Sequence, residues 1–410
     1  MKAADDGATS KLAPDENFIT RAAKPNRAGK DHESPTPKPK LNNMRKDVNI
    51  FHVVSNKLWG GPELYVADLV AQLKADGIYT EIVSAKNDNI IQQFRRLEVP
   101  ISILPLRGLS DFDSPGRLAR LIKRGNNIVH VHSLKDAVTA VFARKISENP
   151  KTKIVFTSHA IERPKTSFIY RKVYREIDKI IFVSQLSYDE FMANKSSFDK
   201  RKAVVINDSI RPMHFAETAA AIDVRSKFNI PSEKVLICCH GRVCKEKGVD
   251  VLVKALSKID KNTYHLIIVG EEMKKFANGL RDYIRENNME GNVTFMGFVE
   301  NVASIIDQCD FGVLPAVWRE PFGLGNLQYM LHGKCHVATN NGGPMEYLTD
   351  GKNALLVNPN DVDQLAATIK QLIENPTLRK QIGESAKAEF ARKLSYEHFY
   401  KKLMKVYQEQ

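Results

Sequence analysis

The stretch Trp318–Tyr347, WREPFGLGNLQYMLHGKCHVATNNGGPMEY, combines two glycine-containing turns with short apolar segments. Its amino end, EPFGL, predicts a helix start with Pro321 in the first turn, where the missing N–H of proline costs nothing. A helix N-terminus carries partial positive charge and free backbone N–H groups, which suit a phosphate. We therefore expect Glu320 and the amides of Gly323 and Leu324 to lie at a ligand site.

The second part of this stretch predicts a short strand, Cys335–Ala338, followed by the loop Asn340–Gly343. Glycines in such a loop let the backbone approach a ligand closely. Each glycine pair taken alone is also typical of an ordinary turn. Together, at the carboxyl ends of neighbouring strands, the two turns fit a site in the crevice of an open parallel sheet.

Strand-length apolar segments alternate with helical patterns on both sides of a connector at residues 207–232. This alternation predicts βαβ units and an α/β fold with two Rossmann-like parallel sheets. Two such domains place a cleft between them, which is a usual position for a ligand. The expected domains are residues 47–207, residues 208–392 and a C-terminal helix at residues 393–410. Residues 1–46 are rich in Lys and Pro and predict a disordered tail, which makes Met44 a candidate start of the native chain.

The composition of the 410 residues suits two domains better than one. The longest apolar runs have the length of a strand, far short of the roughly 18 residues that span a membrane. The N-terminus lacks the apolar core of a signal peptide, and the five cysteines show no paired spacing. Both features favour a cytoplasmic protein in a reducing compartment.

The net charge of +13 is concentrated in the first part of the chain. Residues 48–205 carry 25 Lys and Arg against 16 Asp and Glu, whereas residues 206–410 carry 26 against 25. A nucleic acid, an anionic membrane surface, a phosphate-bearing substrate or a plainly solvated basic face would each account for this. Basic stripes with interleaved aromatics are not apparent. We therefore expect peripheral contact with an anionic membrane and no nucleic-acid partner.

Two cations, Arg242 and Lys247, follow a predicted strand and precede the next helix. A bidentate guanidinium and a point-charge ammonium suit a diphosphate leaving group, although surface cations beside a turn give the same pattern. The nearby Cys238 and Cys239 alternate across the strand, so no four-ligand cage follows and we expect no metal.

Three histidines follow strands of the first predicted domain. His159 ends one strand and is expected at the cleft, where it can orient a hydroxyl or stabilise developing charge. His130 and His132 flank another strand end and are equally well read as structural histidines. The turn at Gly60 and Gly61 fits a phosphate weakly.

In their order and spacing these signals resemble the retaining, GT-B-fold glycosyltransferases of the large family 4 (group 1), from Val48 to the end of the chain. The residues that carry the resemblance are Gly60-Gly61, His159, Val183-Ser184, Gly241-Arg242, Lys247-Gly248, Val269-Gly270, Phe295–Val299, Glu320–Leu324, Gly342-Gly343 and Glu346.

The resemblance implies a GT-B fold, in which two Rossmann-like domains face each other across a cleft. The catalytic residues that it implies are His159, Arg242, Lys247 and Glu320. The donor-binding residues that it implies are Gly60, Gly61, Phe298, Val299, Phe322, Gly323, Leu324 and Gln328. In this scheme Arg242 and Lys247 hold the diphosphate, Glu320 lies beside the sugar hydroxyls, and the backbone at Phe298 meets the nucleobase.

One position departs from the family pattern. The family places a second acid eight positions after the first, where it takes the ribose hydroxyls, and this chain has Gln328 there. An amide accepts one hydrogen bond and donates another, so nucleotide binding is expected to survive with changed affinity or preference.

The resemblance implies a retaining, metal-independent transferase that moves a hexose-like sugar from a nucleoside diphosphate sugar to a glycan or lipid-linked acceptor. Synthesis of surface polysaccharide or lipopolysaccharide is the expected setting, with the nucleotide sugar as co-substrate and no further cofactor. Gln328 also motivates an alternative, a catalytically impaired nucleotide-sugar-binding scaffold on the same fold. An epimerase or phosphorylase on the same architecture is a further rival, although the additional acids or the lysine-bound cofactor they need are not found.

Overall fold

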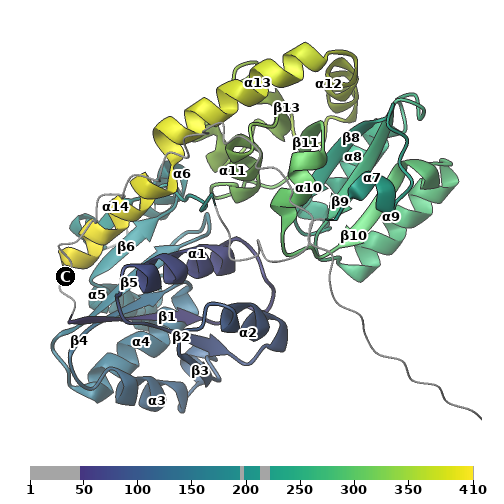
Figure 1. Cartoon of the computed structure of the whole chain (residues 1–410). Helices are drawn as coiled ribbons and strands as arrows, with labels where there is room; N and C mark the ends of the chain where they lie inside the picture. Colours follow the sequence, from purple (N-terminus) through teal and green to yellow (C-terminus); the bar gives the residue numbers. More distant parts are fainter. Residues whose placement is uncertain (1–46, 194–197, 213–221, 410) are drawn as a thin grey trace, which may run out of the picture. The chain divides into compact units, whose positions relative to one another are not determined.

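The computed structural model describes residues 47–193, 198–212 and 222–409, all within the compact unit Asn43–Gln410 (Figure 1). The predicted tail, residues 1–46, lies outside the described residues. Two parallel sheets organise the described chain. We call the part built on the first sheet, β1 to β7, the first half, and the part built on the second sheet, β8 to β13, the second half.

The first sheet has seven parallel strands in the order β3-β2-β1-β4-β5-β6-β7. Its strands are β1 (Val48–Val54), β2 (Thr80–Ala85), β3 (Ile101–Leu104), β4 (Asn126–Val131), β5 (Thr152–Ser158), β6 (Lys179–Phe182) and β7 (Ala203–Val205). The crossover helices are α1 (Gly61–Ala75), α2 (Asp88–Arg95), α3 (Ser114–Leu121), α4 (Leu134–Ser147), α5 (Phe168–Glu176) and α6 (Gln185–Ala193). The strand order reverses between β1 and β4, which is where open α/β sheets bind ligands.

Local sequence explains where these helices begin and end. Pro62 stands in the first turn of α1, and Gly77 follows the helix with a left-handed φ of 73°. Ser133 caps α4 because its hydroxyl accepts a hydrogen bond from the backbone N–H of Asp136 at 3.1 Å. The end of β4 and the start of α4 are thereby fixed beside each other.

The second sheet has six parallel strands in the order β10-β9-β8-β11-β12-β13. Its strands are β8 (Val235–His240), β9 (Tyr264–Val269), β10 (Val293–Gly297), β11 (Phe311–Leu314), β12 (His336–Thr339) and β13 (Leu355–Val357). The helices are α7 (Val224–Lys227), α8 (Val249–Leu256), α9 (Lys274–Glu286), α10 (Val302–Gln308), α11 (Leu324–Leu331), α12 (Val362–Glu374), α13 (Pro376–Glu389) and α14 (Tyr396–Gln408). The α/β fold class with two Rossmann-like sheets is confirmed, whereas the limits of the three domains stay predictions.

The last helix, α14, packs on the core of the first half although it follows the second sheet in the chain (yellow in Figure 1). Buried residues of α14, including Phe399 and Leu403, share one apolar cluster with Ile50 of β1. Two tyrosine hydroxyls add polar contacts: Tyr396 donates to the carbonyl of Asp68 at 3.0 Å, and Tyr407 contacts His130 at 2.6 Å. The helix was expected from sequence, but its pattern does not indicate which half it packs on.

No helix among the described residues combines the length and the apolar character needed to cross a membrane.

Candidate active site

A cavity of about 610 Å³ lies at the carboxyl ends of strands from both sheets. All the predicted site residues line it, namely Gly60, Gly61, His159, Arg242, Lys247, Phe298, Val299, Glu320, Phe322, Gly323, Leu324 and Gln328. The sequence therefore located the lining of the cavity, while the role of each residue stays a prediction.

Lys247 and Glu320 form an ion pair in the wall of this cavity. The ammonium of Lys247 donates a hydrogen bond to Oε1 of Glu320 and lies 5.9 Å from the centre of the Trp318 ring. The side chains of Lys247 and Glu320 are 28% and 13% exposed, so the pair is only partly screened by water. The predicted phosphate-binding cation and the predicted sugar-binding acid therefore meet directly.

The loop with Gly342 and Gly343 holds the backbone of Glu320. The N–H of Gly343 donates to the carbonyl of Glu320 at 2.7 Å, and a Cβ added at Gly342 would lie 2.6 Å from that same carbonyl oxygen. We predicted that this loop approaches a ligand closely. Instead it approaches the Glu320 segment, which explains the need for glycine there, and neither glycine lines the cavity.

The helix start predicted at the same segment is displaced. α11 begins at Leu324, so Pro321 lies before the helix and not in its first turn. The cause is Gly323, whose left-handed backbone (φ 88°, ψ 60°) interrupts helical geometry. The hydroxyl of Tyr347 fixes this bend by donating to the carbonyls of Phe322 and Gly323 at 2.8 and 3.0 Å. The N-terminus of α11 nevertheless lies at the cavity, because Gly323 and Leu324 line it.

The other predicted ligands of the second half are open to the cavity. Arg242 is exposed and makes no ion pair with any described residue, so its guanidinium is available to an anion. Gln328 is half-buried on α11 and lines the cavity at the position where the family pattern has an acid. Phe298 is 47% exposed and lines the same cavity, while the contact of its backbone with a nucleobase stays a prediction.

The first half contributes the opposite lining. A Cβ added at Gly61 would meet Cδ1 of Leu324 at 3.3 Å, so the N-terminus of α1 lies close to that of α11. Two acids of this lining, Glu63 and Asp208, were not predicted from the sequence. Burial raises the pKa of Glu63 and raises that of Asp208 well above its usual range. Asp208 follows β7 closely, as His159 follows β5, and this shared position is the signal that could have found it.

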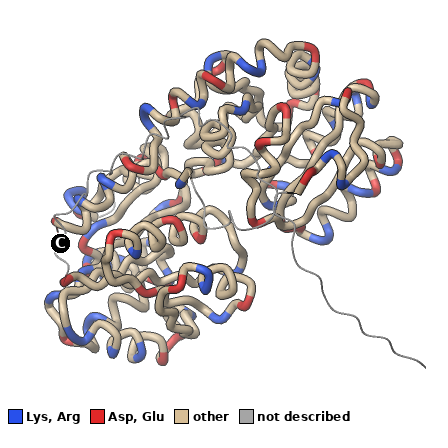
Figure 2. Tube along the Cα trace, in the orientation of Figure 1, with Lys and Arg blue, Asp and Glu red and all other residues tan. Residues whose placement is uncertain are grey.

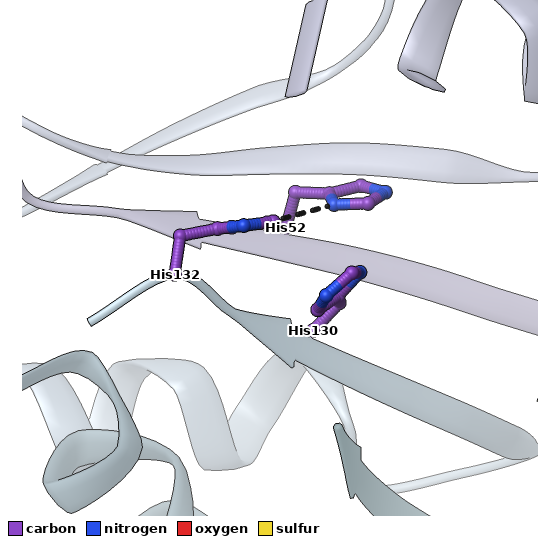
Figure 3. Close-up of side chains that lie close together, drawn as sticks. All are labelled: His52, His130 and His132. Carbon is purple, nitrogen blue, oxygen red and sulfur yellow. Dashed lines mark hydrogen bonds between the residues drawn. The ribbon is translucent and has the colours of Figure 1, made fainter. Parts of the chain in front are cut away.

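Three buried histidines lie together beside the cavity (Figure 3). The ring nitrogens of His52 on β1 and of His130 and His132 at the end of β4 lie within 4.8 Å of one another. A three-histidine group can hold a transition metal. Both nitrogens of His130, however, are already bonded to hydroxyls, at 2.6 Å to Tyr407 and at 2.7 Å to Thr157. The group is therefore better described as a hydrogen-bonded set than as a metal site.

Comparison with protein families identifies the class of protein. Residues 59–211 match the family model described as Glycosyltransferase Family 4, and residues 222–389 match that of Glycosyl transferases group 1. Two Rossmann-like sheets and a cavity lined from both of them agree with this match. The chain belongs to the GT-B-fold glycosyltransferases of this family 4 type.

Individual relatives are more distant. An uncharacterised glycosyltransferase of Methanocaldococcus jannaschii is 36% identical over 41% of this chain and 46% of its own length. The lipopolysaccharide core biosynthesis glycosyltransferase LpsE of Rhizobium meliloti is 26% identical over 42% of this chain and 49% of its own. The chain thus matches about half the length of these relatives. A GDP-mannose-dependent phosphatidylinositol monomannoside mannosyltransferase of Corynebacterium glutamicum is 21% identical over 85% of this chain and 94% of its own.

Solved structures share the fold. The crystal structure of Anabaena HepE in complex with UDP-glucose has a TM-score of 0.76 at 19% identity, covering 88% of this chain and all of that one. A glycosyltransferase from Rickettsia africae has a TM-score of 0.77 at 22% identity, covering 88% of this chain and 98% of its own.

Proposed function

We propose that this protein is a retaining glycosyltransferase that moves a hexose-like sugar from a nucleoside diphosphate sugar to a glycan or lipid-linked acceptor. The observation that carries the proposal is the Lys247–Glu320 pair, which faces the same cavity as Arg242, a cation without an ion pair to any residue that the structure describes. Cations beside an acid suit a substrate that joins a diphosphate to a sugar. The diphosphate binds the cations, and the hydroxyls of the sugar bind the carboxylate.

The proposed chemistry follows from this arrangement. The bond between the anomeric carbon and the diphosphate oxygen breaks while the oxygen of the acceptor hydroxyl bonds to that carbon from the same face, and the hydroxyl proton passes to the leaving diphosphate. Lys247, Arg242 and the N-terminus of α11 stabilise the charge that develops on the leaving diphosphate. These groups supply the positive charge that the step needs, so the reaction as proposed uses no metal ion and no cofactor beyond the nucleotide sugar.

The proposed setting is the synthesis of surface polysaccharide or lipopolysaccharide at the cytoplasmic face of a membrane. Its support is the likeness to LpsE, which is named for lipopolysaccharide core synthesis, and to a mannosyltransferase whose acceptor is a phosphatidylinositol derivative. HepE, which has the same fold, was solved in complex with UDP-glucose, so UDP-glucose is one donor to test for this chain.

Peripheral membrane contact is proposed for the basic first half (Figure 2). Phe168 and Ile169 at the start of α5 are 68% and 47% exposed, and the neighbouring Arg171 and Lys172 are exposed as well. Exposed aromatic and aliphatic side chains beside cations are typical of helices that lie on anionic lipid. This surface would bring the enzyme to a lipid-linked acceptor.

A second candidate function is a nucleotide-sugar-binding scaffold without turnover, and Gln328 in place of the family acid favours it. The two candidates share donor binding and differ in catalysis. A thermal-shift screen of UDP, GDP, ADP and their sugar conjugates identifies the nucleotide, because a ligand that binds only the folded protein raises its melting temperature. Release of the nucleoside diphosphate from the matching sugar conjugate then supports the transferase, and binding without release supports the scaffold.

A further inference from the structure

Three histidine rings form a hydrogen-bonded chain that ends at the cavity. Nδ1 of His52 lies 3.2 Å from Nε2 of His132, and Nδ1 of His132 lies 3.2 Å from Nε2 of His159. The rings come from β1 and from the ends of β4 and β5, which are consecutive in the sheet. Only His159, the last ring, lines the cavity.

The hydrogen bonds between the three histidine rings restrict which ring nitrogens carry a proton. Burial lowers the pKa of His52 and of His159 to about 3 and that of His132 well below its usual range, so each of the three rings is neutral and carries a single N–H. Each link needs one donor and one acceptor, so all three rings carry the proton on the same type of nitrogen. With the protons on Nδ1, the atom left without a partner is Nε2 of His52, an acceptor. The opposite arrangement would leave a buried N–H unpaired, which is rarer in folded proteins.

Nδ1 of His159 therefore presents an N–H toward Asp208. The distance from this nitrogen to Oδ2 of Asp208 is 3.9 Å, which is too long for a direct hydrogen bond. The two side chains are only 9% and 6% exposed, and both residues line the cavity. Oδ1 of Asp208 is buried and has no hydrogen-bond partner among the described residues. A buried carboxyl oxygen without a hydrogen-bond partner lowers stability. A substrate group in the cavity would supply the missing hydrogen bond.

We propose that His159 and Asp208 bind one sugar hydroxyl between them, and that His132 and His52 are positioning residues for His159. The N–H of His159 donates to the hydroxyl oxygen, and the hydroxyl donates its own proton to Asp208. A hydroxyl is suited to this pair because it both accepts and donates. The inference rests on the proposed function and adds Asp208 to the site, together with a role for the two buried histidines.

The hydroxyl belongs either to the transferred sugar or to the acceptor, and binding measurements on Asp208→Asn separate the two. If it belongs to the transferred sugar, the affinity for the nucleotide sugar falls about tenfold, the size of one net hydrogen bond, while affinity for the free nucleoside diphosphate is unchanged. If it belongs to the acceptor, the affinities for the nucleotide sugar and for the free nucleoside diphosphate are both unchanged, and the KM for the acceptor rises about tenfold. Unchanged values in all three measurements, or an equal loss for the diphosphate and its sugar conjugate, would overturn the proposal.

The positioning role is tested without substrate by nitrogen NMR of histidine-labelled protein, which distinguishes an Nδ1–H ring from an Nε2–H ring. We expect His159 in the Nδ1–H form in the native protein and a mixture of forms in His132→Asn. His265→Asn is the matched control, because this buried histidine on β9 bonds Thr294 and does not line the cavity. An Nε2–H form of native His159, or a metal ion bound to His52 and His132, would contradict the hydrogen-bonded arrangement of the three rings. Failure of the proposed function appears separately, as native protein that binds no nucleotide sugar.

Discussion

Lys247 donates a hydrogen bond to the carboxylate of Glu320 across 73 residues of sequence. Lys247 follows the end of β8, and Glu320 lies in the segment between β11 and α11. The two side chains meet because β8 and β11 are neighbours in the sheet. The pair holds a cation and an acid at adjacent points of one cavity wall. A nucleotide sugar presents a diphosphate and a sugar at a similarly short separation.

The glycine at position 342 is predicted to be required for the shape of the site. Gly342→Ala would place a methyl group 2.6 Å from the backbone of Glu320 in a residue with φ of 79°. We expect a loss of about 1–3 kcal/mol in the free energy of unfolding, from strain at a special backbone position, together with a large loss of turnover. Gly351→Ala is the matched control, because φ is 68° there and the added methyl meets open space. It should lose stability and keep turnover; equal turnover in both variants would contradict the account.

Gln328→Glu restores the acid of the family pattern. Because the residue lines the cavity on α11, we expect the affinity for the nucleotide to change more than the turnover number. Titration calorimetry with the nucleoside diphosphate, beside steady-state kinetics with its sugar conjugate, measures the two effects. If neither value changes, residue 328 does not contact the ribose.

Stability is predicted to fall as the pH drops below 6.5. Burial lowers the pKa of six histidines: His52, His130, His132, His159, His265 and His336. Below pH 6.5 these histidines bind protons in the unfolded chain but not in the folded chain. The free energy of unfolding therefore falls by about 1.4 kcal/mol per proton and per pH unit. Their contribution is complete above pH 6.5 and is lost as the pH falls toward their folded values, about 3 to 4 where values are given.

Buried acids oppose this trend. Burial raises the pKa of Glu63, of Asp136 to about 6, and of Asp208, so these groups add stability as the pH falls. They are outnumbered by the histidines, so urea unfolding should show a lower free energy at pH 5.5 than at pH 7.5. His265→Asn should reduce the pH slope by about one proton. A flat or rising profile toward acid would contradict the assignment of neutral histidines.

Membrane contact is predicted to depend on the start of α5. Replacing Phe168 and Ile169 together by Ser should reduce sedimentation with vesicles that contain anionic lipid, because both apolar side chains are exposed beside cations. Met273→Ser removes an apolar side chain of the second half that is 50% exposed and serves as control. Equal binding of both variants would place the membrane surface elsewhere or show that there is none.

The sequence was most informative where local pattern and topology agree. The alternation of strands and helices predicted both sheets, and the position of a residue after a strand predicted that His159 and Arg242 reach one cavity. Contacts between distant segments were not predictable from a single sequence. The packing of α14 on the first half, and the approach of Gly342 to Glu320, depend on tertiary neighbours that no local pattern encodes.

Buried polar groups were the other omission. Asp208 follows a strand in a short polar segment, Asn-Asp-Ser, that is equally typical of a turn. His52 stands among apolar residues of β1, where its spacing shows only that it is buried. The contacts of His52 could be assigned only from the sheet order, which places β1, β4 and β5 side by side.

The central claim is that Lys247 and its neighbours serve the transfer of a sugar from a nucleoside diphosphate. The most direct measurement is the rate at which purified protein releases nucleoside diphosphate from the sugar conjugate identified by thermal shift. We expect Lys247→Ala to lower this rate by a factor of about 10²–10³, the usual effect of losing one charge-stabilising donor. Lys245→Ala should leave it unchanged, because Lys245 is exposed in the same turn and does not line the cavity. Equal rates in the native protein and in both variants would contradict the account.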